Sequence, residues 1–149
     1  YMAFRRQITL AKQYGLPIVI HSRNSTQECI DLVKEGLDGG LTGVFHCFSG
    51  SYELAKEVVK LGFFLGIGGV VTYKNAGLPA VLAKLSLENI VLETDAPYLT
   101  PVPFRGKRNE SSYLSYIVQK LAEIYGVSPE EVARITTANA LQLFKSSSL

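Results

Sequence analysis

Strand-like and helix-like segments alternate along this sequence at intervals of roughly 25 residues, and this alternation limits the fold to the α/β class. Four short runs rich in apolar and β-branched residues read as strands: residues 17–21, 43–48, 63–69 and 90–95. These runs are apolar almost throughout instead of alternating with polar residues, which is typical of parallel strands covered on both faces. We therefore expect a parallel sheet with a helix between successive strands.

Capping and terminating residues mark the helix boundaries. The first helix is expected to end at Gly15, ahead of a proline. Two capping boxes, each with a serine at the N-cap and a glutamate three residues later, predict helices that open at Ser25 and at Ser128. Further helices are expected at residues 51–62, 78–85 and 114–125.

Two architectures fit four strand–helix units in strict alternation, namely an open doubly wound sheet and half of an eight-stranded barrel. No G-x-G-x-x-G motif opens a helix, because the glycines at positions 66, 68 and 69 have a different spacing and stay within a strand and its end. The strand and helix patterns alone leave both architectures open.

Length and composition indicate one ordinary domain. The chain has 149 residues, of which 47% are hydrophobic and 19% charged, so it can bury a core and does not resemble a disordered chain. The formal net charge of +2 excludes a strongly basic, histone-like DNA binder. Cys29 and Cys47 form no CxxC motif and are expected to be reduced thiols in a cytoplasmic protein. We expect no membrane span and no signal peptide.

Both histidines of the chain, His21 and His46, fall at the ends of expected strands, and Asp95 ends a third. In parallel α/β folds the carboxyl ends of the strands hold the active site. Imidazole nitrogens with a carboxylate oxygen are a usual ligand set for zinc and similar divalent ions. The alternative is that each histidine is a hydrogen-bonded core residue. The expected position of all three side chains at the carboxyl ends of strands favours a metal site.

Glu93 precedes Asp95 by two residues, so in a continuous strand both side chains would point to the inner face. A buried carboxylate needs a partner. Three roles remain open for Glu93: orienting a metal ligand, contacting substrate, or forming an internal salt bridge with an arginine such as Arg23.

The segment Arg105-Gly106-Lys107-Arg108-Asn109-Glu110 follows the last strand and a proline-rich loop. It brings three cations to the same mouth as the candidate metal site. Cations beside a metal suit a substrate that contains phosphate. The alternative is an ordinary solvated loop, and the position of the segment favours substrate binding.

Four segments, in order and at family-like spacing, resemble the TatD-type deoxyribonuclease family. They are Ile20-His21-Ser22-Arg23, His46 to Ser51 (His-Cys-Phe-Ser-Gly-Ser), Glu93 to Leu99 (Glu-Thr-Asp-Ala-Pro-Tyr-Leu) and Arg105 to Glu110. Each motif is modest alone, but together they are highly specific, and the resemblance extends over essentially the whole chain.

The resemblance implies a TIM-type (β/α)8 barrel of the amidohydrolase kind, with a two-metal site that hydrolyses DNA phosphodiester bonds. The expected cofactor is a divalent ion (Mg, Mn or Zn), two per complete site. His21, His46 and Asp95 fall on metal ligands of the family, and Asp95 is the candidate to accept the proton of the attacking water. The expected substrate-binding residues are Arg23, Glu93, Arg105, Lys107, Arg108 and Asn109.

The family also places a His-x-His pair on its first strand and a bridging glutamate in its first half, and this chain contains neither. Residues 1–149 are therefore expected to be the C-terminal half of such a barrel, with about the last four β/α units. Either the missing N-terminal half or a second copy of the chain would complete it, so a stable monomer is not expected. Two other functions remain open: hydrolysis of a different phosphate or amide bond, and a catalytically silent structural fragment.

Overall fold

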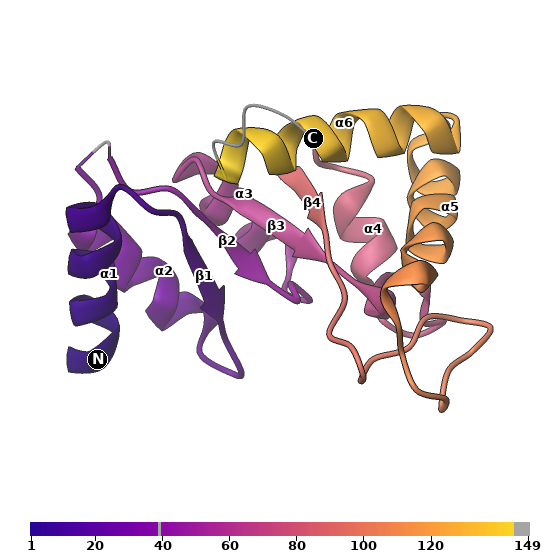
Figure 1. Ribbon diagram of the computed structural model, residues 1–149, viewed down its shortest axis with the longest axis horizontal. Coiled ribbons are helices and arrows are strands. Elements are labelled where there is room, and N and C mark those ends of the chain that lie inside the picture. The colour runs from indigo at the N-terminus through magenta and orange to yellow at the C-terminus, as the bar shows by residue number, and fades with distance from the viewer. Residues whose placement is uncertain (39, 145–149) are drawn as a thin grey trace.

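A computed structural model describes residues 1–38 and 40–144 of the chain. Its centre is a parallel sheet of four strands, shown in Figure 1: β1 (Ile18–His21), β2 (Gly43–His46), β3 (Phe64–Ile67) and β4 (Ile90–Leu92). The strands lie side by side in the order β1-β2-β3-β4, the order in which they occur in the chain.

This sequential order decides between the two architectures left open by the sequence. In a doubly wound sheet the strand order reverses at a switch point, whereas in a barrel each strand lies beside the one before it. The described sheet has no reversal, so it is wound as a TIM-type barrel is wound. Within the described residues, β1 and β4 are the edge strands, and each pairs on one side only.

In the described residues, one α-helix precedes the sheet, α1 (Met2–Tyr14), and five connect or follow its strands: α2 (Thr26–Gly36), α3 (Tyr52–Lys60), α4 (Leu78–Leu82), α5 (Leu114–Tyr125) and α6 (Pro129–Phe144). Short 3-10 turns lie at Gly69–Thr72, Leu87–Asn89 and Ser111–Tyr113. Strand residues that alternate along the chain face the helices and are buried with them in one apolar core. Examples are Phe45, Leu65 and Ile90, which are at most 1% exposed.

The opposite face of the sheet, which would face the interior of a barrel, has two levels. Near the amino ends of the strands, Val44 and Val91 pack against Leu143 of α6 in a separate small apolar cluster. Figure 1 shows α6 lying across the end of the sheet at which the strands begin. Val19, which has the same strand position on edge strand β1, is 56% exposed. The carboxyl ends of the strands form the second level and carry the polar side chains.

Asn139 attaches α6 to the sheet. Its side-chain Nδ2 donates to the backbone oxygens of Leu87, at 3.0 Å, and Ile90, at 2.7 Å. The residue is only 6% exposed, so these bonds form out of contact with bulk water. Carbonyl groups at the start of β4 thereby gain partners that the sheet itself does not provide.

Several predicted boundaries differ from the structure. The second strand ends at His46 instead of residue 48, because Cys47 adopts a left-handed conformation with φ 49°. The fourth strand ends at Leu92, so the expected placement of Glu93 and Asp95 within it is wrong, although both carboxylates still face His46. Helix α2 opens after Ser25 as predicted, but Ser25 makes no side-chain capping bond, so that capping box is not formed.

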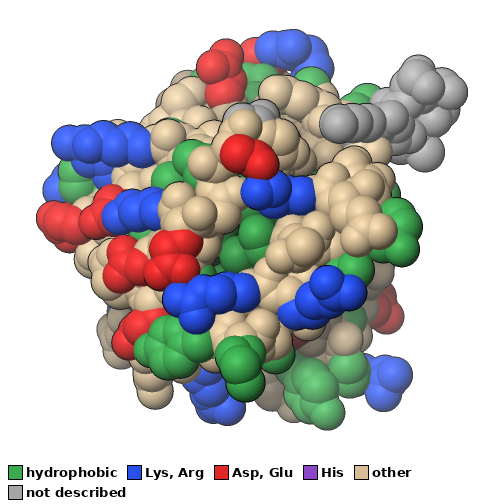
Figure 2. All heavy atoms as spheres, turned by 90° about the vertical axis from the view of Figure 1, so that its left-hand side faces the viewer, with side chains coloured by type: hydrophobic (Ala, Val, Ile, Leu, Met, Phe, Trp, Pro, Cys, Tyr) green, Lys and Arg blue, Asp and Glu red, His purple; other side chains and the backbone are tan. Residues whose placement is uncertain are grey.

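The surface that carries α1 and α2 mixes both signs of charge, as Figure 2 shows. Arg5 pairs with Glu35 at 2.8 Å, and Lys12 pairs with Asp38 at 2.6 Å. These contacts are exposed and contribute little stability each. Their paired charges leave no uniformly basic field on this surface. Within the described residues, no helix is long and apolar enough to cross a membrane.

Candidate metal site at the strand ends

The parallel register brings the two histidines together at the carboxyl ends of neighbouring strands. His21 of β1 is the direct pairing partner of His46 of β2. Their ring centroids are 5.7 Å apart. The side chain of His46 is 19% exposed, while His21 on the edge strand is exposed. The sequence-based expectation that both rings reach the same mouth is consistent with this geometry.

The two nitrogens of His46 face two different carboxylates. Nδ1 lies 2.8 Å from Oε2 of Glu93, and Nε2 lies 3.4 Å from Oδ1 of Asp95. Glu93 therefore contacts His46 and forms no salt bridge with Arg23. Among the roles left open for Glu93, this contact favours the orientation of a metal ligand.

Cys47 contributes its backbone to the site. Its N–H donates to Oε1 of Glu93, and the left-handed conformation of this non-glycine residue is uncommon. Its thiol is a poor nucleophile at neutral pH, because burial and the nearby carboxylates of Glu93 and Asp95 raise the pKa of Cys47 to about 11. Burial also raises the pKa of Glu93, and the contact with His46 opposes that rise in part.

The contacts of His46 fit the binding of a cation at Nε2. The tautomer that donates from Nδ1 to Glu93 leaves a lone pair on Nε2, which then faces an acceptor oxygen of Asp95 at 3.4 Å. Two acceptors this close are stabilised by a positive charge between them. Two ligands of one tetrahedral zinc ion are separated by about 3.3 Å, given bond lengths of about 2.0–2.1 Å. The spacing of Nε2 and Oδ1 matches that value.

The described residues nevertheless supply only part of a metal site. Across residues 1–38 and 40–144, no group of three or more His, Cys, Asp and Glu side chains lies close enough together to hold a metal ion. His46 and Asp95 form the close pair, and His21 stands beside them without completing a cluster. A divalent ion usually takes four or more ligands, so others would have to complete this set.

The predicted substrate cations lie on a loop that is held against the protein. The guanidinium of Arg105 stacks over the ring of Tyr73, 4.2 Å from its centroid. Nζ of Lys107 lies 5.7 Å from the ring centroid of Phe104. Among the described residues, Arg105, Lys107 and Arg108 are exposed and form no ion pair, and neither does exposed Arg23. Their charges remain available to an anion.

Asn109 differs from these cations because it is 3% exposed. Its Nδ2 donates to the backbone oxygen of Tyr98 at 2.7 Å, and its own N–H donates to the oxygen of Pro97 at 3.0 Å. Its Oδ1 accepts from the N–H of Glu110. Asn109 thus joins the two ends of the loop at residues 97–109. Its predicted contact with substrate stays a prediction, but in this structure its amide holds the loop in place.

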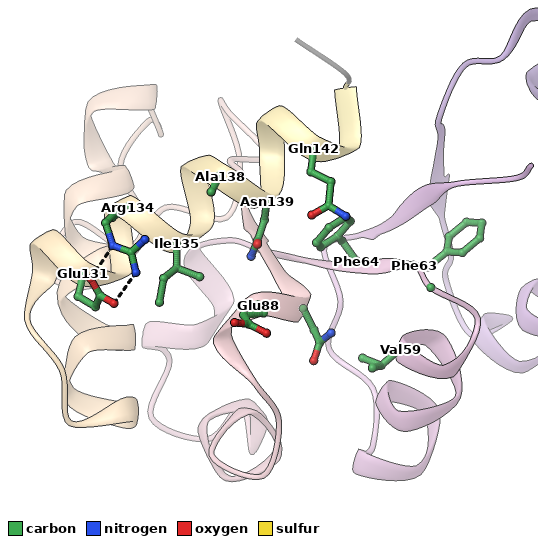
Figure 3. A pocket seen from close by; sticks show the side chains of 12 residues that line it. Val59, Phe63, Phe64, Glu88, Glu131, Arg134, Ile135, Ala138, Asn139 and Gln142 are labelled. Atoms are coloured by element: carbon green, nitrogen blue, oxygen red, sulfur yellow. Dashed lines mark hydrogen bonds and ion pairs between the residues drawn. The ribbon is translucent and has the colours of Figure 1, made fainter. Parts of the chain in front are cut away.

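A separate hollow of about 620 Å³ lies under α6 (Figure 3). Its lining includes Phe64 at the start of β3 and Asn89 just before β4, so it lies at the amino ends of the strands. Figure 3 shows Arg134 turned toward Glu131 of the same helix, and their side chains are paired at 2.7 Å. The strand-end site is at the other end of the sheet, so this hollow is not part of it.

Fold and site together define a class: an α/β protein wound as a TIM-type barrel, with histidines and carboxylates gathered at the carboxyl ends of its strands. Comparison with known proteins gives the family. Residues 1–145 match the TatD related DNase family. The chain therefore belongs to this family, as the sequence motifs indicated.

Relatives support this assignment. The chain is 47% identical to the uncharacterized metal-dependent hydrolase YabD of Bacillus subtilis over 95% of its length, which covers 56% of YabD. It is 40% identical to the uncharacterized metal-dependent hydrolase TatD of Mycobacterium tuberculosis, covering 54% of that protein. The crystal structure of YjjV, a TatD homologue from Escherichia coli, is 34% identical and superposes with a TM-score of 0.87 over 93% of this chain and 54% of YjjV. The chain spans about half the length of the relatives it matches.

Proposed function

We propose that the protein to which these residues belong is a metal-dependent deoxyribonuclease that hydrolyses DNA phosphodiester bonds. One observation carries the proposal: Nε2 of His46 faces Oδ1 of Asp95 at 3.4 Å, while the other ring nitrogen is held by Glu93. This arrangement presents a nitrogen and an oxygen ligand to a common cation at the end of a sheet where barrel enzymes hold their active sites.

In this proposal His21, His46 and Asp95 hold a divalent ion (Mg, Mn or Zn), and a complete site contains two such ions. When bound, the ion supplies a Lewis acid for the phosphoryl group and lowers the pKa of water. The free oxygen of the Asp95 carboxylate would accept the proton of the attacking water.

The cationic loop supports a phosphate-containing substrate. Arg105 is held over Tyr73, whose hydroxyl in turn donates to the backbone oxygen of Thr100 at 3.0 Å. A guanidinium held in this way loses little side-chain freedom when it binds a phosphate. Lys107 and Arg108 on the same loop, and Arg23 after β1, add unpaired positive charge. We assign these four side chains to the DNA backbone.

The remaining ligands are proposed to come from residues outside this sequence, which would pair with the free edges of β1 and β4. The coverage of the relatives, 54–56% of their length, supports this source. The exposure of Val19, at 56% on an inward-facing strand position, is a further indication. A second copy of the chain is the competing source. Native mass spectrometry of the protein expressed from its natural reading frame separates the two, since an active monomer of about 260 residues supports the first and a dimer of 149-residue chains the second.

A cytoplasmic location belongs to the same proposal, supported by two cysteines that are both free. Hydrolysis of another phosphate or amide bond is the main alternative activity, because the ligands do not fix the substrate.

The test is cleavage of a labelled DNA duplex by the protein from its natural reading frame, with and without EDTA. We expect EDTA or His46→Ala to abolish cleavage. Arg108→Ala should weaken DNA binding and reduce the slope of log affinity against log salt by about 1, because one phosphate contact is lost. Arg134→Ala on α6 is the matched control, since it removes an exposed arginine far from the strand ends. Cleavage that survives EDTA or His46→Ala would refute the proposal.

A further inference from the structure

Glu93 reaches His46 across an intervening strand. Glu93 directly follows β4 and His46 ends β2, and β3 lies between these two strands in the sheet. The carboxylate nevertheless reaches past β3 to residues at the end of β2. Its Oε2 lies 2.8 Å from Nδ1 of His46, and its Oε1 accepts from the N–H of Cys47. The Glu93 side chain therefore passes over the surface of β3.

Gly66 is the residue of β3 beneath this carboxylate. A Cβ built on Gly66 would lie 2.4 Å from Oε2 of Glu93 and 3.2 Å from Cα of His46. Separations under 3.0 Å are not tolerated by real side chains, so any residue larger than glycine must displace the carboxylate. Gly68, two residues further along, is different, because its Cβ would lie 3.5 Å from the nearest atom, which is ordinary contact.

Both carboxylate oxygens of Glu93 accept hydrogen bonds from neighbouring residues, His46 and Cys47. The N–H of Cys47, a residue in the left-handed conformation with φ 49°, donates to Oε1. A non-glycine residue in this conformation is strained, and the surrounding contacts must offset that strain. The carboxylate is therefore fixed at two points, and its second oxygen has a defined position at Nδ1.

We infer that Glu93 is a positioning residue that acts through His46: its carboxylate, seated over Gly66, holds the His46 proton on Nδ1 and so leaves the lone pair of Nε2 for a metal ion. A carboxylate behind a ligating histidine commonly fixes the ring orientation and tautomer, and its loss weakens metal binding by 10- to 100-fold. This inference rests on the proposed metal function for its purpose, but its geometry can be tested without metal.

Two variants break the contact in different ways. Glu93→Gln keeps the size of the side chain but has one acceptor oxygen, which can occupy only one of the two positions that Oε1 and Oε2 hold against Cys47 N–H and Nδ1. When its oxygen stays on Cys47, its amide N–H₂ faces Nδ1 and favours the proton on Nε2. Gly66→Ala keeps the Glu93 side chain but displaces its carboxylate by steric contact, and the added methyl group also crowds Cα of His46. Gly68→Ala is the matched control, because Gly68 has an extended conformation (φ −117°, ψ −161°) open to alanine.

The primary measurement is the tautomer of His46 in the metal-free protein, from two-bond ¹H–¹⁵N NMR correlations at a pH where the ring is neutral, assigned with His46→Ala. The second is the affinity for Zn²⁺ by isothermal titration calorimetry. We expect a proton on Nδ1 in the wild type and in Gly68→Ala. Glu93→Gln should move the proton toward Nε2 and weaken Zn²⁺ binding by 10- to 100-fold, and Gly66→Ala should have the same effect.

The outcomes separate this inference from the proposed function. An unchanged His46 tautomer in Glu93→Gln overturns the inference, even if the protein cleaves DNA. Equal effects of Gly66→Ala and Gly68→Ala overturn the role of Gly66. If the wild-type protein from its natural reading frame binds no Zn²⁺, the proposed metal function fails, while a tautomer change in Glu93→Gln still supports the positioning role. If Gly66→Ala does not fold by circular dichroism, the Glu93→Gln comparison decides alone.

Discussion

Replacing Asn139 tests how α6 is held to the sheet. Its amide donates two hydrogen bonds, to the backbone oxygens of Leu87 and Ile90, and is almost fully buried. In Asn139→Ala both oxygens lose this donor, and water cannot easily replace it. In Asn139→Asp the shape is kept, but a carboxylate oxygen faces two carbonyl oxygens.

The expected magnitudes follow from these contacts. Each hydrogen bond contributes about 0.5–1.5 kcal/mol net, so the loss of two costs about 1–3 kcal/mol. The small cavity left by the amide adds to this cost, and we expect Asn139→Ala to lower the free energy of unfolding by about 2–3 kcal/mol. Asn139→Asp should cost more at neutral pH, because a buried carboxylate without a donor is worse than an apolar methyl group.

Urea unfolding followed by circular dichroism provides the assay. A loss of 2–3 kcal/mol should lower the midpoint by about 1 M. Gln142→Ala, at an exposed position on the next turn of α6, is the control and should change stability by less than about 0.5 kcal/mol.

The pH dependence adds a sharper criterion. Burial raises the folded-state pKa of the introduced Asp above its unfolded value of about 3.9, so its penalty is full above the folded pKa and disappears below the unfolded one. The gap between Asn139→Asp and Asn139→Ala should therefore close as the pH falls. If Asn139→Asp and Asn139→Ala are equally stable at pH 7, the conclusion that the buried Asn139 amide donates to the backbone oxygens of Leu87 and Ile90 is wrong.

Two further substitutions test the core. Gly43→Ala should lower the free energy of unfolding by about 3 kcal/mol or more, because its Cβ would lie 2.3 Å from the backbone oxygen of Ile18. Gly40→Ala is the control: its Cβ would lie 3.7 Å from the nearest neighbour, so it should be nearly neutral in the same urea unfolding assay. Tyr125→Phe should cost about 1 kcal/mol at pH 7, because the hydroxyl donates to the backbone oxygen of Leu82 at 2.9 Å. Burial raises the pKa of Tyr125, so the extra stability of the wild type over Tyr125→Phe should be lost as the pH rises above about 10. A stability difference that persists above this pH would contradict the burial of the Tyr125 hydroxyl.

Features that depend on a few neighbouring residues were predictable from the sequence. Gly15 ends α1 in a left-handed conformation, as its position before Pro17 suggested. Ser128 accepts from the N–H of Glu131, which confirms half of the predicted capping box there. The parallel sheet was also predicted correctly, because strands covered on both faces leave a continuous apolar pattern.

Features that depend on tertiary contacts were not predictable in this way. Ser25 and Ser128 open similar capping-box sequences, but only the second forms a capping bond in this structure. A four-residue pattern does not report the backbone angles that a loop imposes on its last residue. The strand that ends at Leu92, short of Asp95, reflects the same limit. Parallel pairing stops there although the residues beyond it are still compatible with a strand.

The choice between a barrel and a doubly wound sheet required strand order, and strand order also explains why Gly66 escaped notice. In the sequence, the glycines at positions 66, 68 and 69 indicated only that the segment lacks the spacing of a dinucleotide-binding motif. With β3 placed between β2 and β4, any side chain that links the ends of those two strands must cross β3. A Cβ on the middle strand obstructs such a link, as the 2.4 Å approach at Gly66 shows. In a sequentially wound sheet, a glycine on the strand between two polar strand ends therefore indicates a side-chain contact that crosses the middle strand. Here that contact joins Glu93 and His46.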